Sequence, residues 1–566
     1  MEEESGEIIE KKEDNSESII EDRRGKLRFK LFGWVEDNYD KVFLAVLIFA
    51  FILRLLIFFK TLNQPLWWDA ATYMTTAKKW GLGLDINTVW YFRRAFLWPL
   101  IGAILFKFGF GETGVRFAEV LFSTGIVFVS YFLIKDMFNK KYALFASLGL
   151  ALSWVILFFT GRPLTSIPAT FFLLTSLLFF WKGYELKQGN KFIYLFGLFY
   201  ALSILVRMQY LMFAPVFLIF LFVKEKLNFL KSKHFWIAIG IFFLVLLPHL
   251  IIYTIHYGNP ITDIASHYFG VGVSPAEGTQ KVQSISKIFM YFPDLPYILT
   301  GDNLKGVSYF GSLSRTLSWG LFLFFLIGVL SFFLELFLGF DKIFQNRNIQ
   351  KKLFIFLWII APFLFLGYMM RIVEQRYVMP TFPFLFLIVS WGLFSIGNLT
   401  FKKLNKNNLG ILIFIIFLLL LIPNYTFGNS LIDSKKISYK EVMDSGIWIK
   451  ENSNPTDIVV SQSFPQTSYY SERSVYNFDE EGDPESKITR DEEGFNSFVE
   501  REKPRYLILS AFEKHPEWAY RYPEKNMDKL ITVKVYEQEG KPLLVIYEFK
   551  PWESKISSIN ETFPLI

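Results

Sequence analysis

Long apolar stretches recur along this chain and leave few folds open to it. Each is about 15 to 24 residues long, close to the length that an α-helix needs to cross a bilayer. They lie at 42–59, 116–134, 141–159, 165–181, 191–206, 208–223, 235–255, 315–338, 353–369, 377–397 and 409–423. Hydrophobic residues make up 52% of the 566 residues, above the usual share for soluble domains. The sequence therefore predicts a mainly α fold, a polytopic membrane bundle of about eleven helices.

The basic residues between these stretches predict the orientation of the bundle. Lysines gather in loops that fall on one face of the membrane, at 135–141, 182–187, 224–233, 342–352 and 402–406. Because short cytoplasmic loops are enriched in Lys and Arg, we expect a multi-pass cell-membrane protein with a cytoplasmic N-terminus. The outer face then receives loops 60–115 and 256–314. The segment 96–108 is short and contains Lys107, so it is predicted to lie in the interface.

Changes in amino-acid composition along the sequence divide the chain into three parts. Residues 1–41 are predicted to be a disordered cytoplasmic tail, 42–425 the membrane domain and 426–566 an extracytoplasmic domain. The last part contains the strand-like runs DIVVS and PRYLILS and a hairpin pattern around Glu539-Gly540, which predict a small α/β domain. No glycine-rich phosphate loop appears in it, so we expect no nucleotide site there. The net charge of +7 resides largely in membrane-flanking loops, and we expect no nucleic-acid partner.

Several arginines depart from the orientation rule, because they lie beside membrane boundaries on the predicted outer face. They are Arg93, Arg94, Arg162, Arg207, Arg371 and Arg376. Desolvation of a guanidinium group at such a boundary is costly unless an anion accompanies it. Arg can hold a phosphate through two N–H groups, and membrane lipids supply phosphates. Together these residues predict an anion site at the outer rim, with extension of single side chains toward lipid headgroups as the alternative.

Three motifs follow one another in an order that is known from one family. The first outer loop contains Asp69-Ala-Ala-Thr-Tyr73, and the second apolar stretch opens with Gly111-Glu-Thr-Gly-Val-Arg116. Late in the chain stands Arg376-Tyr377-Val-Met-Pro380-Thr-Phe-Pro383. From about residue 40 to 425 this order resembles the GT-C membrane glycosyltransferases that use polyprenyl-phosphate sugars. It is similar above all to protein O-mannosyltransferases and to the aminoarabinose transferase of lipid A.

The resemblance implies a mannosyltransferase-like enzyme that uses a dolichyl-phosphate-type donor, a polyprenyl-phosphate-linked hexose or pentose. The sugar would pass with inversion to a hydroxyl of a protein, glycan or lipid on the outer face. Asp69 would be the general base that takes the proton from this hydroxyl. Arginines would stabilise the leaving phosphate. The residues implied for the donor phosphate are Arg376, Arg207, Arg93 and Arg94, and those implied for substrate contacts are Tyr73, Trp68, Tyr377 and His267.

Departures from the family pattern concern metal binding. Ala70 replaces the second acid of the first motif, and Arg93 stands near a position that is often acidic. Thr165 or Ser166, within the outer connection GRPLTSIP at 161–168, replaces another acid of the family. Cys is absent, so a metal would need oxygen or His ligands. We therefore expect no cofactor and no metal ion. The alternative is a divalent cation held by other outer carboxylates, namely Asp263, Asp294 and Asp302.

Each functional assignment has a plainer alternative. Asp69 would also serve as the N-cap of a helix that follows it. Trp67 and Trp68 fit an interfacial aromatic belt, and His256 and His267 fit polar anchors near the membrane. For the whole chain the alternative is a lipid-linked sugar flippase or transporter, although no inverted repeat or matched pair of broken helices supports it. A receptor with a membrane anchor would need one span rather than about eleven.

Overall fold

The computed structural model describes residues 38–87, 94–260, 288–302, 312–369, 373–400, 406–478 and 491–550. These residues form two compact units. The first contains the segments up to Leu62, Phe92–Trp98 and Arg116–Lys435, and the second contains Asn63–Tyr91, Pro99–Val115 and the chain from Lys436. The loop predicted to be the first outer one is thus grouped largely with the C-terminal residues.

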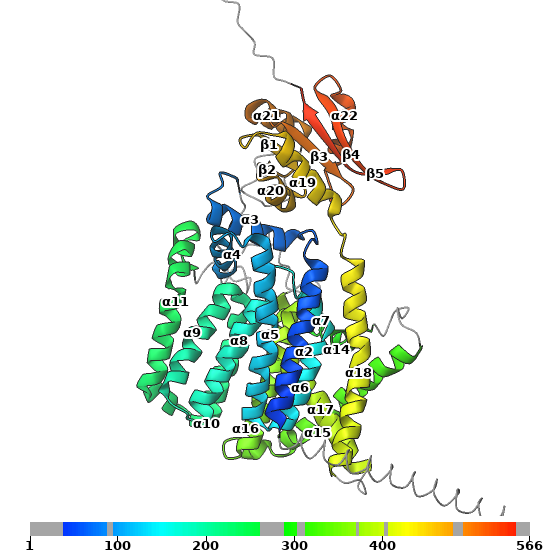
Figure 1. Ribbon diagram of the computed structural model, residues 1–566. Coiled ribbons are helices and arrows are strands. Elements are labelled where there is room, and N and C mark those ends of the chain that lie inside the picture. The colour runs from blue at the N-terminus through cyan, green and yellow to red at the C-terminus, as the bar shows by residue number, and fades with distance from the viewer. Residues whose placement is uncertain are drawn as a thin grey trace, which may run out of the picture. The chain divides into compact units, whose positions relative to one another are not determined.

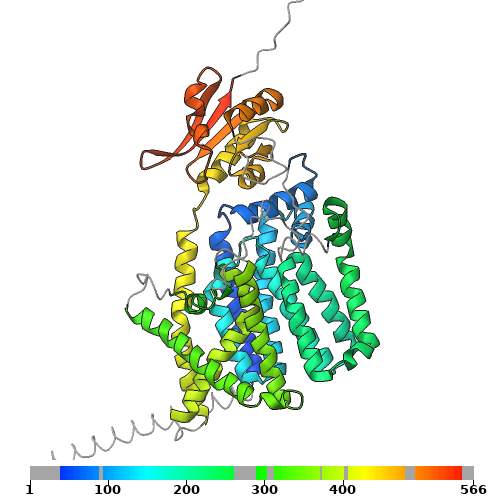
Figure 2. The ribbon, with the colours of Figure 1, turned by 180° about the vertical axis from the view of Figure 1, so that it is seen from behind.

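The first unit is a bundle of long apolar helices, which run alongside one another while α15 lies oblique to its neighbours (Figures 1 and 2). Each of the predicted apolar stretches is helical. In chain order the helices are α2 (Tyr39–Thr61), α5 (Gly111–Met137), α6 (Lys140–Leu152), α7 (Trp154–Phe159), α8 (Ser166–Phe180) with η1 (Trp181–Glu185), α9 (Asn190–Val206), η2 (Met208–Phe213) with α10 (Ala214–Glu225), α11 (Lys233–Tyr257), α15 (Ser312–Leu338), α16 (Arg347–Met369), η5 (Gln375–Thr381) with α17 (Phe382–Thr400), and α18 (Lys406–Ser434). Within the described residues, nine helices are long and apolar enough to cross a membrane. The predicted membrane-helix fold is confirmed, with a count of spans that is approximate.

Buried polar side chains stabilise the predicted span 141–159, which a non-helical residue divides into two α-helices. The stretch 141–159 breaks at Ser153 between α6 and α7, which leaves backbone groups without helical partners. Arg54 of α2 donates from Nη1 to Ala151 O at 3.3 Å and from Nη2 to Leu150 O at 3.2 Å. Asn424 of α18 accepts from Trp154 N at 2.9 Å. The break is therefore satisfied on both sides although it lies among apolar helices.

Helix α18 is longer than its apolar core. It continues through Pro423 to Ser434, beyond the predicted limit of the membrane domain at 425. Lys60 at the end of α2 forms an ion pair with Asp433 at 2.7 Å and donates to Asn429 Oδ1 at 2.8 Å. These contacts stabilise the polar end of α18 as a helix, a feature that hydropathy alone does not reveal.

The second unit contains two helices that lie between α2 and α5 in the sequence, α3 (Trp68–Leu82) and α4 (Leu97–Lys107, from Pro99 onward). Helix α4 occupies the segment predicted to be interfacial, and with 11 residues it is too short to span a bilayer. Small residues allow α3 and α4 to approach closely, since a Cβ at Gly102 would lie 2.8 Å from Ala77 Cβ.

The C-terminal residues form the predicted α/β domain. Its helices are α19 (Lys440–Asn452), α20 (Phe464–Ser471), α21 (Glu492–Glu502) and α22 (Glu517–Lys525), and its strands are β1 (Ile458–Ser461), β2 (Ser474–Tyr476), β3 (Tyr506–Ser510), β4 (Leu530–Gln538) and β5 (Lys541–Phe549). The sheet order is β2-β1-β3-β5-β4, with β2, β1 and β3 parallel and β5 antiparallel to β3 and β4. Neighbouring residues alternate between two cores, as Val459 and Val460 do, so each face of the sheet is covered.

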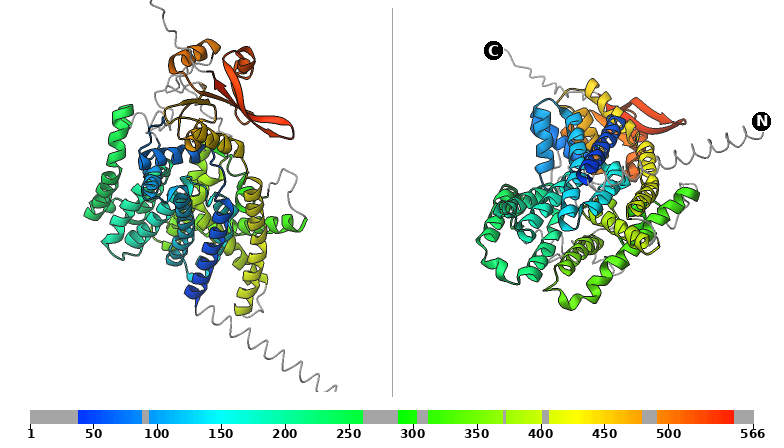
Figure 3. Two further views of the ribbon diagram at one scale, coloured as in Figure 1. Left: turned by 45° about the horizontal axis from the view of Figure 1, so that its top comes forward. Right: turned by 60° about the horizontal axis from the view of Figure 1, so that its bottom comes forward.

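The predicted hairpin is also present. Strands β4 and β5 turn at Glu539-Gly540 and project from the rest of the sheet (Figure 3). Both predicted strands at 457–461 and 504–510 lie in the centre of the sheet, as β1 and β3. The short apolar runs thus belong to the buried strands, as expected for parallel strands covered on both faces.

The lysine-rich loops generate a prediction about orientation. Because the chain lacks Cys, single cysteines placed at the exposed positions Ser497 and Asn228 would be the only thiols. We expect Ser497→Cys to react with an impermeant maleimide added outside intact cells, and Asn228→Cys to react only after permeabilisation. The cysteine-free parent controls for background, and reaction of both variants from one side would contradict the orientation.

Candidate active site

Arg116, at the beginning of α5, joins three segments of the bundle. Its side chain is 1% exposed. Its Nη1 donates to Thr61 O of α2 at 3.1 Å and to Gly161 O, between α7 and α8, at 2.8 Å. Gly161 has a φ of +81°, and a Cβ there would lie 2.7 Å from Thr61 Oγ1. A glycine therefore suits this position, both in backbone conformation and in space.

Arg162 lies in the same connection and brings a second buried charge. It is 5% exposed, and its guanidinium carbon lies 3.9 Å from the centre of the Phe158 ring. Burial lowers the pKa of Arg162, and the charges of Arg116 and Arg376 act in the same direction. Three guanidinium groups thus share one poorly hydrated region, where an anion would be strongly favoured.

Arg207 and Arg376 meet at the ring of Tyr377. Arg207 follows α9 at an extended residue and donates from Nη1 to Ser166 Oγ at 2.8 Å. Its guanidinium carbon lies 3.9 Å from the centre of the Tyr377 ring, and that of Arg376 lies 5.2 Å from it. Two residues that the sequence assigned to the donor phosphate and one that it assigned to substrate contacts therefore come together. With Arg116 and Arg162 they form what we call the arginine cluster.

Sequence reasoning missed the residues that position Arg376. Glu374 Oε2 lies 3.1 Å from Arg376 Nε, and Glu374 N donates to Tyr291 OH at 3.2 Å. Gln375 Nε2 donates to Asp294 Oδ2 at 3.3 Å. Burial raises the pKa of Tyr291 to about 12, so its hydroxyl stays protonated at neutral pH. The sequence signal that could have indicated this pair is Glu374, an acid two residues before Arg376.

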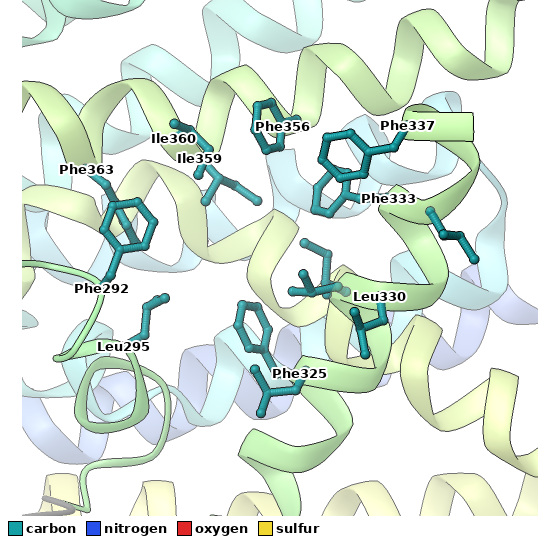
Figure 4. Close-up of a pocket in the computed structure, with 14 residues that line it drawn as sticks. Phe292, Leu295, Phe325, Leu330, Phe333, Phe337, Phe356, Ile359, Ile360 and Phe363 are labelled. Carbon is teal, nitrogen blue, oxygen red and sulfur yellow. The ribbon is translucent and has the colours of Figure 1, made fainter. Parts of the chain in front are cut away.

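An apolar cavity of about 340 Å³ opens within the first unit (Figure 4). It lies between α15 and α16, and Phe292, Leu295 and Phe363 line one end of it. Phe363 contacts the rings of Phe292 and Tyr291, with centroids 5.6 and 5.9 Å apart. Tyr291 also accepts the hydrogen bond from Glu374 N, so it links this end of the cavity to the segment that carries Arg376. Leu330, which also lines the cavity, is 72% exposed, so the cavity reaches the surface of the bundle.

Asp69 lies in the second unit, in the first turn of α3. The helix begins at Trp68, so the N-cap position belongs to Trp67, whose side chain makes no capping bond. The alternative that Asp69 is an N-cap is therefore wrong, because the chain already enters the helix before it. A carboxylate in the first turn still interacts favourably with the helix dipole, by about 0.3–1 kcal/mol. Asp69 and Tyr73, one turn later, are both partly exposed.

Trp68 contacts the α/β domain within the same unit. Its Nε1 donates to Glu513 Oε1 at 2.9 Å, and its ring packs edge-on against Phe464 at 6.1 Å. Of the other predicted site residues, Arg94 is partly exposed, whereas Arg93 and His267 lie outside the described residues, as do Arg371 and Asp263. In the described part of the chain, no three His, Asp or Glu residues gather as metal ligands would.

Comparisons with known proteins agree with this architecture. Residues 94–252 match the family model for dolichyl-phosphate-mannose-protein mannosyltransferases. ArnT from Cupriavidus metallidurans bound to undecaprenyl phosphate has a TM-score of 0.61 at 12% identity, covering 91% of this chain and 98% of its own. Its apo form gives 0.61 at 13% identity with the same coverage. The Archaeoglobus fulgidus oligosaccharyltransferase in its apo form gives 0.55 at 15% identity, covering 83% of this chain and 69% of that one. No curated protein matches the sequence.

The expected GT-C fold is thereby confirmed. The matching family model and the similar structures are all of glycosyltransferases, and together they indicate that this protein is a membrane glycosyltransferase.

Gly161 provides a test of the local geometry. Gly161→Ala should lower the melting temperature more than Gly83→Ala, because residue 83 also has a positive φ, in the left-handed α region, but has no atom within 4 Å of the place that a Cβ would take. Both changes place an alanine at a positive φ, and only the first adds the contact with Thr61. Thermal unfolding in detergent measures both variants. Equal losses would contradict the close approach of Thr61.

Proposed function

We propose that the protein transfers a sugar from a polyprenyl-phosphate donor to an acceptor hydroxyl, with inversion, using Asp69 as the general base. The observation that carries the proposal is the arginine cluster, in which Arg207 and Arg376 contact the ring of Tyr377 and Arg376 acts on the buried Arg162 through its charge. ArnT, which shares the fold, is bound to undecaprenyl phosphate in its structure. The family model over residues 94–252 describes enzymes of dolichyl-phosphate mannose. Mannose is therefore the first sugar to test.

The arginine cluster would hold the donor phosphate. Each charge-assisted hydrogen bond contributes about 1.5–3 kcal/mol, and burial strengthens the attraction because water screens it less. The phosphate diester carries one negative charge before transfer and two after the sugar leaves. Donors that already surround it therefore stabilise the charge that develops in the transition state.

The apolar cavity between α15 and α16 would hold the first part of the isoprenoid chain. A chain leaving a phosphate near Arg376 meets Tyr291, Phe363 and Phe292 in turn. The bilayer is as apolar as the cavity, so this contact adds little affinity and mainly orients the lipid. Affinity and recognition would come from the phosphate.

The reaction would be a single displacement at the anomeric carbon. The acceptor O–H bond breaks and its proton passes to the Asp69 carboxylate, while the acceptor oxygen bonds to the anomeric carbon. The bond from this carbon to the phosphate oxygen breaks, and the electron pair leaves with polyprenyl phosphate. We infer that no metal is needed, since the guanidinium groups supply the positive charge that a cation would otherwise give.

A transfer assay separates this function from a flippase. Purified protein receives radiolabelled polyprenyl-phosphate sugars, mannose first, with peptide, glycan and lipid acceptors. We expect release of polyprenyl phosphate that depends on acceptor and persists in excess EDTA. Movement of intact lipid across liposomes without release would favour a flippase. Loss of transfer with EDTA and recovery with Mg²⁺ or Mn²⁺ would contradict the metal-free mechanism.

Arg376 tests the phosphate site. Arg376→Ala removes a charge-assisted contact of about 1.5–3 kcal/mol, so donor affinity should fall about tenfold or more. The measurement is donor titration in the transfer assay together with direct binding of polyprenyl phosphate. Arg521→Ala, an exposed arginine of α22, is the matched control. A folded Arg376→Ala protein with unchanged donor affinity would remove Arg376 from the site.

Asp69 tests the chemistry. Asp69→Asn keeps the size of the side chain but cannot take the proton at neutral pH, so turnover should fall by about 10² to 10⁴ while donor binding is retained. Asp85→Asn, an exposed acid of the same outer loop, should retain turnover. Because Asp69 is not the N-cap, the substitution leaves the cap position of α3 unchanged. Near wild-type turnover in Asp69→Asn would refute its role as base.

A further inference from the structure

The first turn of α3 is fastened to the α/β domain within the second unit. Trp68 Nε1 donates to Glu513 Oε1 at 2.9 Å, and Ser463 Oγ lies 3.4 Å from the same oxygen. Leu66 N, just before the helix, donates to Tyr470 OH at 2.8 Å. These contacts lie on either side of the point where the chain enters α3, and Asp69 is the next residue after Trp68.

The remainder of α3 and the residues after it are fastened to the same domain. Thr75 Oγ1 lies 3.2 Å from Pro465 O, and Lys78 forms an ion pair with Glu472 at 2.7 Å. Burial would raise the pKa of Glu472, but its pairing with Lys450 and Lys78 outweighs this and lowers the pKa. Beyond the helix, Asn87 exchanges two hydrogen bonds with the backbone of Val475 in β2, at 2.6 and 2.7 Å.

We propose that the α/β domain positions the catalytic helix, with Glu513 acting on Asp69 through Trp68. The inference rests on the proposed function, in which Asp69 is the base. Glu513 is a positioning residue, since it bonds to Trp68 and takes no part in the chemistry. The indole N–H of Trp68 is its only hydrogen-bonding group, and it is directed at this carboxylate rather than at a substrate.

Position matters here because proton transfer and displacement need near-contact geometry. A misplacement of about 1 Å in a reacting group can cost about 10²-fold in rate. Removing the Glu513 carboxylate takes away one of the contacts that hold the first turn of α3, while the residues of the arginine cluster, which belong to the other unit, are unchanged. The expected signature is therefore a fall in kcat with little change in the KM for donor.

The test combines activity with a structural measurement that needs no substrate. Glu513→Ala and Glu513→Gln are made in the full chain, with Glu517→Gln, an exposed acid of the same domain, as the control. A second set carries Thr75→Cys, because Thr75 is 3% exposed and the chain has no other thiol. The rate at which maleimide labels this thiol reports how often α3 separates from α20.

We expect Glu513→Ala to raise the labelling rate about tenfold or more, as loss of a bond to a charged group predicts, and to lower kcat about tenfold to a hundredfold. Glu513→Gln keeps an acceptor oxygen and should recover part of both. An unchanged labelling rate in Glu513→Ala would overturn the claim that Glu513 holds α3 against the α/β domain. Faster labelling with unchanged kcat would overturn the positioning role. Absence of transfer in the wild type would instead overturn the proposed function, while labelling still decides whether Glu513 holds α3.

Discussion

Positive charge buried among apolar helices is the constraint on which this bundle depends. A guanidinium group in such surroundings loses several kcal/mol of hydration unless hydrogen bonds or an anion replace it. Arg54 and Arg116 donate hydrogen bonds to backbone carbonyl groups at places where helices break or end. Arg207 and Arg376 instead converge on one tyrosine ring. Arginine therefore satisfies backbone carbonyl groups at one place in the bundle and forms a candidate anion site at another.

Hydropathy was sufficient to predict the helices, because each apolar stretch carries its signal locally. It did not predict the break at Ser153, since that break is stabilised by residues that are distant in sequence. Arg54 reaches Ala151 across 97 residues, and Asn424 reaches Trp154 across 270. The strands β1 and β3 and the hairpin were predicted for the same local reason, whereas their order in the sheet depends on long-range pairing.

The residues of the candidate site also divide into those that have a local signal in the sequence and those that do not. Arg207 and Arg376 were predicted because a charge at an apolar boundary is visible in sequence, and Tyr377 came from its motif. Glu374 pairs with Tyr291 across 83 residues, and Trp68 with Glu513 across 445, so no local pattern indicated either contact. The N-cap alternative for Asp69 failed for a local reason, since the backbone turns helical one residue earlier, at Trp68. The roles assigned to all of the site residues, those of Arg207, Arg376 and Tyr377 included, stay predictions.

The segment that contains α3 and the α/β domain stabilise each other within the second unit. A 15-residue helix such as α3 is marginal alone, because isolated helices of about 12–15 residues barely hold together in water. Strand β2 is an edge strand of three residues, and an open edge can pair with other chains. Asn87 covers part of that edge while α20 gives α3 a surface to pack on. The opposite edge, β4, carries exposed charges at Lys534 and Glu537. The two edges of the sheet are therefore protected differently, β4 by its own charged side chains and β2 by Asn87 of the segment that also carries Asp69.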